Sequence, residues 1–250
     1  RSMPMSPARI WERAEPASAP SKPKVLLNMA LAVVVGLIVG VGLAFFLEYL
    51  DTSVKTMEDV ENFLQVPVLA VVPKEISLLL EHPDATADAE AYRILRTNVE
   101  FNRQSPDANT LTFVSGGAGE GKSTTLATLA YTFAQGGYNT LVVDADLRRP
   151  TQHRFFGVDG DRGLTDFLTT DVDLEDVVQT TSMPNLFLLP SGKLPFDAVG
   201  VLNSQRMMDL IAQVKNRFDV VFFDSPPILG GSDASVLVRA VDLTIVVVQH

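Results

Sequence analysis

The feature that most constrains the fold is a glycine-rich stretch between an apolar run and a helix-forming run. The apolar run at residues 110–114 is typical of a strand, and residues 124–135 favour a helix. Between them stands the spacing Gly116-x4-Gly121-Lys122-Ser123, the pattern of a phosphate-binding P-loop. A strand, a glycine-rich turn and a helix in this order are the context that such a loop requires. The stretch therefore predicts an α/β domain that binds a nucleoside triphosphate.

Each residue type in this loop has a physical role. Glycines let several backbone N–H groups point at phosphate oxygens, and the N-terminus of the following helix adds partial positive charge. Lys122 is expected to contact the β- and γ-phosphates of ATP, and the Ser123 hydroxyl is expected to bind Mg²⁺. Because Lys122 lies in a predicted loop, Lys122→Met is expected to abolish nucleotide-dependent activity and to leave the fold largely intact. The predicted ATP contacts are Gly117, Ala118, Gly119, Glu120, Gly121, Lys122, Ser123 and Thr124.

Further apolar runs predict a parallel sheet. They cover residues 140–143, 185–189, 219–223 and 243–248, and helix-forming segments at about 204–217 and 232–239 lie between some of them. Continuous apolar strands that alternate with helices are typical of a parallel sheet covered on both faces. Ligands bind such sheets at the carboxyl ends of the strands. We therefore expect the P-loop and the polar clusters at 144–149, 190–192 and 224–227 to converge on one site.

Acidic residues at the predicted strand ends supply what phosphoryl transfer needs. Asp224 follows the apolar run 220–223 and has the form of a Walker B carboxylate, which holds Mg²⁺ through water. Asp144 and Asp146 are two residues apart, so their side chains can share one face of an extended chain. One would support the Mg²⁺ shell and the other would orient or deprotonate an attacking hydroxyl, while Arg148 would stabilise transition-state charge. The alternative for a single Asp is a turn or helix-capping role.

The N-terminal part of the chain predicts a membrane helix. Residues 25–47 carry no charge and contain Asn28 as the only clearly polar side chain. At about 1.5 Å per residue this run is long enough to cross a bilayer. The alternative is a buried helix of a soluble protein. The basic segment 1–24 would be cytoplasmic by the positive-inside rule, but ATP is a cytosolic ligand, so we expect the domain after the helix to be cytoplasmic.

Composition narrows the class further. The chain has no cysteine, which excludes disulfides, thiolate metal sites and a cysteine nucleophile. Its net charge of −10 argues against nucleic acid as the main partner. The chain begins with Arg1, and its last residues read as a strand cut short, so we expect a fragment of a longer protein.

The predicted organisation has four parts. Residues 1–24 form an extracytoplasmic linker, and 25–47 form the transmembrane helix. Residues 48–87 form a cytoplasmic linker with a short helix at 54–64 and a strand at 68–72, and 88–250 form the P-loop domain. The helix predicted at 88–103 carries Glu90-x-x-Arg93-x-x-Arg96. By itself this pattern is typical of a solvated face with intrahelical ion pairs.

Together these residues resemble a known family. The stretches GEGKS (119–123), VVDADLRRP (142–150) and FFDSPP (222–227) are similar to the three Walker motifs of bacterial tyrosine kinases, the BY-kinases. Glu90, Arg93 and Arg96 match the family's oligomerisation motif in place and spacing. Residues 25–73 resemble the last membrane helix and following segment of the exopolysaccharide co-polymerases to which these kinases are commonly fused.

The resemblance implies an inner-membrane protein with a cytoplasmic kinase domain. Such proteins phosphorylate tyrosines in the C-terminal tail of a neighbouring subunit within a ring, and they regulate the length or export of a polysaccharide. By resemblance, Lys122 contacts phosphate and Asp146 is the base or hydroxyl-orienting residue. Ser123, Asp144 and Asp224 belong to the metal shell, and the motif that begins at Glu90 contacts a neighbouring subunit.

Departures from the family pattern leave two alternatives open. Ala118 replaces a usual proline, residues 194–203 replace a proline-rich pattern, and the last tyrosine in the chain is Tyr138, a gap we attribute to truncation. The first alternative is a ParA/MinD-type ATPase, although the signature lysine of those proteins is Gly117 here. The second is a co-polymerase scaffold that binds ATP without catalysis.

Overall fold

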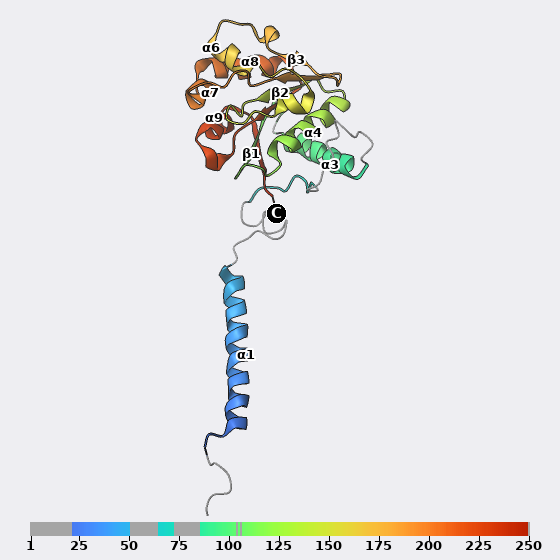
Figure 1. Ribbon diagram of the computed structural model, residues 1–250. Coiled ribbons are helices and arrows are strands. Elements are labelled where there is room, and N and C mark those ends of the chain that lie inside the picture. Colours follow the sequence, from blue (N-terminus) through green and yellow to red (C-terminus); the bar gives the residue numbers. More distant parts are fainter. Residues whose placement is uncertain (1–21, 51–64, 73–85, 104, 106, 250) are drawn as a thin grey trace, which may run out of the picture. The chain divides into compact units, whose positions relative to one another are not determined.

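The computed structural model describes residues 22–50, 65–72, 86–103, 105 and 107–249 (Figure 1). The chain divides into two compact units, Arg1–Lys55 and Thr56–His250. The predicted helix at 54–64 and most of the predicted linker at 1–24 lie outside the described residues.

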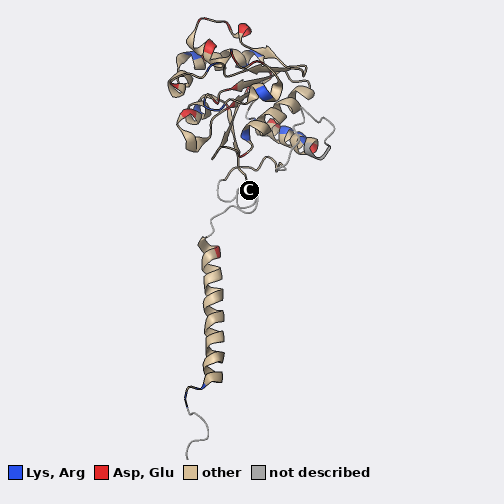
Figure 2. Ribbon diagram, viewed as in Figure 1, with Lys and Arg blue, Asp and Glu red and all other residues tan. Residues whose placement is uncertain are grey.

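The first unit contains a single long apolar helix in its described part. Helix α1 (Val25–Leu50) contains an 18-residue window with a mean hydropathy of 2.8, and none of its side chains is buried. Figure 2 shows almost its whole length without charge. At about 1.5 Å per residue, a 26-residue helix exceeds the roughly 30 Å hydrocarbon core of a bilayer. By length and composition α1 is therefore able to cross a membrane, and it continues through Leu50, beyond the predicted end at residue 47.

The second unit is built on a six-stranded sheet with the order β3-β4-β2-β5-β1-β6. The strands are β1 (Thr110–Ser115), β2 (Thr140–Asp144), β3 (Gln179–Thr180), β4 (Leu186–Leu189), β5 (Val220–Asp224) and β6 (Leu243–Val247). Neighbouring strands are parallel except β3, which pairs antiparallel with β4. The parallel sheet predicted from the apolar runs is confirmed. The antiparallel strand was not predicted, because its two residues are too few to form an apolar run.

Helices cover both faces of this sheet, as predicted. They are α3 (Thr86–Asn102), α4 (Lys122–Gln135), α5 (Gln152–Phe156), α6 (Leu164–Thr169), α7 (Ala198–Leu202), α8 (Gln205–Arg217) and α9 (Asp233–Ala240), with short 3-10 turns at η1 (Leu174–Asp176) and η2 (Ile228–Gly230). In Figure 1, α3 and α4 lie to one side of the sheet and α6 to α9 to the other.

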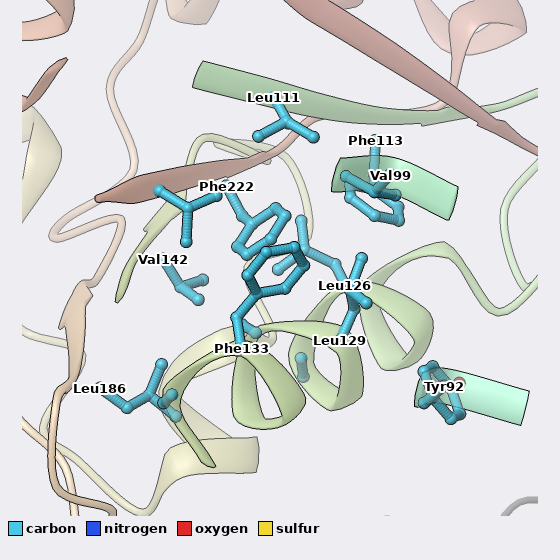
Figure 3. Packing of buried hydrophobic residues seen from close by; sticks show 14 of the residues in the cluster. Tyr92, Val99, Leu111, Phe113, Leu126, Leu129, Phe133, Val142, Leu186 and Phe222 are labelled. Carbon is cyan, nitrogen blue, oxygen red and sulfur yellow. The ribbon is translucent and has the colours of Figure 1, made fainter. Parts of the chain in front are cut away.

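Side chains along the central strands point alternately to the two faces of the sheet, and this produces two separate hydrophobic cores. In β5, Val220 and Phe222 belong to the core under α3 and α4, whereas Val221 and Phe223 belong to the core under α6 to α9. Successive side chains of a strand point to opposite faces, so a continuous apolar run fills both layers. Figure 3 shows the first core, where the rings of Phe133 and Phe222 pack edge to face with their centroids 5.4 Å apart.

The predicted strand at residues 68–72 is wrong. Residues 65–72 form no strand or helix. The Leu69 carbonyl accepts a hydrogen bond from the Asn98 side chain of α3 at 2.6 Å, and Leu69, Ala70 and Val72 pack on the α3–α4 core. The apolar residues of this segment are thus used for side-chain packing against the core, without pairing to the sheet.

Candidate nucleotide site

The glycine-rich stretch has the strand–loop–helix geometry that its spacing predicts. Strand β1 ends at Ser115 and α4 begins at Lys122. Gly119 and Gly121 have φ angles of 89° and 84°, a left-handed conformation that side chains disfavour. The loop therefore needs glycine at these two positions, and it leads directly into the N-terminus of a helix, where backbone N–H groups favour an anion.

The side chain of Glu120 binds the loop's own backbone. Its carboxylate accepts hydrogen bonds from the N–H groups of Gly117 at 2.7 Å and Gly116 at 3.1 Å. The sequence places Glu120 among the phosphate contacts through its backbone, and the structure adds a function for its side chain. It holds the first part of the loop in its curled conformation.

A buried ion pair joins the P-loop lysine to the end of β5. The Lys122 ammonium pairs with Asp224 Oδ1 and also lies 3.1 Å from the Ser123 hydroxyl. The Lys122 side chain is 6% exposed and that of Asp224 is fully buried. Asp224 comes from a strand that neighbours both β1 and β2, so the sheet order brings the carboxylate to the P-loop.

Asp144 lies beside Asp224 in the register of β2 and β5. Burial, together with the negative charge of Asp224, raises the pKa of Asp144 from 3.8 to about 8. Asp144 Oδ2 accepts hydrogen bonds from the backbone N–H groups of Thr151 and Gln152, both at 3.0 Å. Its Oδ1 is buried and has no hydrogen-bond partner among the described residues. Two of the predicted metal ligands therefore meet at adjacent strand ends.

Gln152 belongs to this site although the sequence analysis did not identify it. It is fully buried, and its amide Nε2 donates to Asp224 Oδ2 at 2.6 Å and to the Ser123 carbonyl at 3.1 Å. Gln152 lies outside the three Walker motifs, and a single glutamine has no sequence pattern that indicates a role in a site. The available signal was its position at the start of the helix that follows the Asp-x-Asp strand end, six residues after Asp146.

Asp146 and Arg148 have contacts that differ from the predicted ones. Asp146 Oδ1 accepts the backbone N–H groups of Arg148 and Arg149 at 3.2 and 3.0 Å, which is the turn-forming role left open as an alternative. The Arg148 guanidinium binds both oxygens of Asp233, at 2.7 and 2.9 Å, and the Gly230 carbonyl at 2.7 Å. Stabilising transition-state charge with Arg148 would require these contacts to open.

The polar cluster at residues 190–192 makes hydrogen bonds with the start of α6. The Pro190 and Ser191 carbonyls accept the backbone N–H groups of Leu164 and Thr165, at 2.7 and 3.0 Å. The cluster thus holds the beginning of α6. Because Leu189 pairs with Val143 in parallel strands, the cluster follows β4 at the same edge of the sheet as Asp144, and its convergence on the P-loop stays a prediction.

The three predicted oligomerisation residues lie on α3. Glu90 and Arg93 form an exposed ion pair at 3.2 Å. Arg96 Nη1 donates to the Thr132 carbonyl of α4 at 3.1 Å, so this side chain contacts its own domain.

The site residues fit a magnesium ion. Oxygen donors are the ligands that Mg²⁺ prefers, and it is usually held by one or two carboxylates together with substrate phosphates. Ser123, Asp144 and Asp224 supply such a set, and the buried Asp144 Oδ1 has no other partner in the described part of the chain. Among the described residues no group of three or more acidic, His or Cys side chains is placed to hold a metal ion by itself.

Comparison with known proteins identifies the family. Residues 109–250 match the model of an AAA domain. The chain is 38% identical to the tyrosine-protein kinase YwqD of Bacillus subtilis, over 65% of this chain and 68% of that protein. The chain belongs to the bacterial tyrosine-protein kinase family. It is 31% identical to the tyrosine-protein kinase ptk of Acinetobacter johnsonii, over 97% of this chain and 35% of that protein. The chain thus spans about a third of the length of that relative.

The fold of the family is also that of the chain. The solved structure of the kinase domain of Escherichia coli tyrosine kinase ETK matches with a TM-score of 0.71 and 29% identity, over 78% of this chain and 82% of that one. Family and fold together imply that the chain binds a nucleotide.

Proposed function

We propose that the protein transfers the γ-phosphoryl group of ATP to tyrosine hydroxyls of protein substrates. The observation that carries this proposal is the buried cluster in which Lys122, Asp224 and Asp144, from three chain segments, meet at the P-loop. Phosphoryl transfer asks a protein mainly for positioning and for compensation of charge, and this cluster supplies both. Membership in the tyrosine-protein kinase family supports tyrosine as the acceptor.

Each residue of the cluster has a defined part in this function. Lys122 exchanges its contact with Asp224 for the β- and γ-phosphates, and the backbone N–H groups of residues 117–124 bind the phosphate oxygens. Ser123, Asp144 and Asp224 hold Mg²⁺, which neutralises charge that develops on the phosphates. Asp146 orients or deprotonates the tyrosine hydroxyl.

The proposed setting is the cytoplasmic face of a bacterial inner membrane, with α1 as the anchor. The proposed acceptor is a tyrosine-containing tail of a neighbouring subunit in a ring, and α3 contributes contacts between subunits through Glu90, Arg93 and Arg96. The proposed role is to regulate the length or export of an exopolysaccharide through its export machinery. Relatives named EpsB and CpsD support this setting.

The test is phosphotransfer from labelled ATP with Mg²⁺, in the chain extended to its natural C-terminus. We expect label on tyrosine, and its loss in Asp146→Asn. The matched control is Asp209→Asn, which changes an exposed carboxyl on α8. ATP hydrolysis without phosphotyrosine would overturn the proposal in favour of a ParA/MinD-type ATPase. ATP binding with neither reaction would favour the scaffold.

A further inference from the structure

Gln152 contacts all three of the predicted metal-binding residues. Its side-chain amide donates to Asp224 Oδ2 and to the carbonyl of Ser123, and its backbone N–H donates to Asp144 Oδ2. These partners belong to three different motifs, the strand end of β5, the P-loop helix and the strand end of β2. The same motifs are brought together by the sheet, and Gln152 contacts a polar group of each of them.

The chemistry of the amide determines its orientation. An amide nitrogen carries two N–H donors, and both face acceptors here, the Asp224 carboxylate and the Ser123 carbonyl. The reversed amide would place its oxygen against these two oxygens, which is repulsive. The Oε1 atom is buried and has no partner among the described residues, so it is an acceptor left over for a donor that enters the site.

In both Asp224 and Asp144, hydrogen bonds to one carboxylate oxygen fix the orientation of the whole carboxylate group, including its second oxygen. Gln152 holds Oδ2 of Asp224, and Oδ1 pairs with Lys122, a group that a phosphate would draw away. In Asp144 the backbone N–H groups of Gln152 and Thr151 hold Oδ2, and Oδ1 has no partner in the described part of the chain. In each carboxylate, therefore, one oxygen is held by donors at the start of α5 and the other is available to a cation. Contacts of this kind set the orientation of metal-ligating carboxylates.

We propose that Gln152 is the positioning residue of the magnesium site, which holds Asp224, Ser123 and Asp144 in the orientation that receives the cation. This inference rests on the proposed function, which supplies the nucleotide-bound cation. It goes beyond that function because it assigns metal affinity to a residue outside the Walker motifs that touches no phosphate.

The experiment compares cation affinity with nucleotide affinity in the 250-residue chain in detergent. The test variant is Gln152→Met, which has a similar volume and no donor, and the control is Gln213→Met, an exposed glutamine on α8. Mn²⁺ binding in the presence of saturating ADP is measured by electron paramagnetic resonance. ADP binding in EDTA is measured by calorimetry, and thermal unfolding reports on the fold.

We expect Gln152→Met to weaken Mn²⁺ binding by about 10- to 100-fold, the usual effect of removing a partner that orients metal ligands. ADP binding without metal should change by less than about 2-fold, since Gln152 contacts no phosphate-binding N–H group, and the control should match wild type. If Gln152→Met does not fold, Gln152→Asn, which withdraws the donors by one methylene, carries the same expectation.

Unchanged Mn²⁺ affinity, or an equal loss of Mn²⁺ and metal-free ADP affinity, would overturn the inference, because a merely structural role affects both alike. The readout does not depend on phosphotransfer. If the wild-type chain binds Mn²⁺ with ADP, and the chain extended to its natural C-terminus forms no phosphotyrosine, the kinase proposal is removed and this inference stands. A wild-type chain that binds no Mn²⁺ with ADP would overturn the inference itself.

Discussion

At the scale of single residues, the site is a network of buried ionisable groups. Lys122, Asp144 and Asp224 are each at most 6% exposed. Buried charges are tolerated when they are paired and hydrogen-bonded, and removing one partner is costly because the other stays behind. The same residues therefore determine both nucleotide chemistry and stability.

Lys122→Met tests this coupling. The expectation of a largely intact fold assumed that Lys122 lies in a loop, and this position is wrong because Lys122 is the buried first residue of α4. We expect loss of nucleotide binding together with a fall in the free energy of unfolding of about 3–5 kcal/mol, the usual cost of breaking a buried ion pair. Calorimetric binding of ATP and urea unfolding measure the two effects. A variant as stable as wild type would contradict the burial argument.

Asp144→Asn tests the effect of pH. Because the pKa of Asp144 is raised from 3.8 to about 8, the folded state binds a proton that the unfolded state releases between these values. The free energy of unfolding therefore falls as pH rises from about 4 to about 8. We expect Asp144→Asn, which can still accept the N–H groups of Thr151 and Gln152, to unfold at a higher temperature than wild type at pH 8 and to show a flatter pH profile. Parallel profiles for the two proteins would refute this assignment.

At the scale of elements, the end of β4 and the start of α6 are packed backbone against backbone. A Cβ atom on Gly163 would lie 2.0 Å from the Pro190 carbonyl oxygen and 2.8 Å from the Gly192 nitrogen. Neither group is the flexible end of a side chain, so neither can move aside without moving the chain. The hydrogen bonds from Leu164 and Thr165 depend on this close approach.

Gly163→Ala is therefore expected to destabilise the domain by about 1–3 kcal/mol or more, the range for overpacked sites. The matched control is Gly230→Ala, where an added Cβ meets nothing within 4 Å. Thermal unfolding of the two variants measures the difference. Equal melting temperatures would show that the α6 junction is able to relax.

At the scale of the whole molecule, α3 carries two kinds of contact. One is an exposed ion pair on the surface, and the other is a hydrogen bond to α4 within the domain. Glu90 and Arg93 face solvent as an ion pair, with side chains 62% and 57% exposed, whereas Arg96 is bound to the end of α4. A change at Arg96 therefore disturbs the fold of the monomer as well as any subunit contact. The exposed pair is the cleaner place to test assembly.

Glu90→Ala combined with Arg93→Ala is expected to convert the proposed ring to monomers. Stability should change by no more than about 0.5 kcal/mol, because exposed i,i+3 pairs contribute little. Light scattering of the chain in detergent measures the mass, and thermal unfolding serves as the control for folding. An unchanged oligomer would sink the assignment of this motif to subunit contacts.

Features that depend on neighbouring residues were predicted from the sequence, whereas contacts between distant residues were not. The P-loop, the parallel strands and the acidic strand ends were predicted, because each depends on the pattern of a few neighbouring residues. The strand at 68–72 was wrong, because apolar residues alone do not say whether a segment pairs with a sheet or packs on a core. Gln152 and Asp233 were missed, since their partners lie far away in the sequence: Gln152 contacts Asp224, 72 residues on, and Asp233 contacts Arg148, 85 residues before it.

By itself, therefore, the sequence determined the class of the fold, the place of the phosphate loop and the carboxylates that meet it. Glycine spacing, strand periodicity and the position of Asp at a strand end all act over a few residues. The tertiary structure alone decided that Lys122 pairs with Asp224, that Gln152 holds three motifs together and that Arg148 binds Asp233. These contacts follow from the strand order β2-β5-β1, which places side chains distant in the sequence at one edge of the sheet. No local pattern encodes that order.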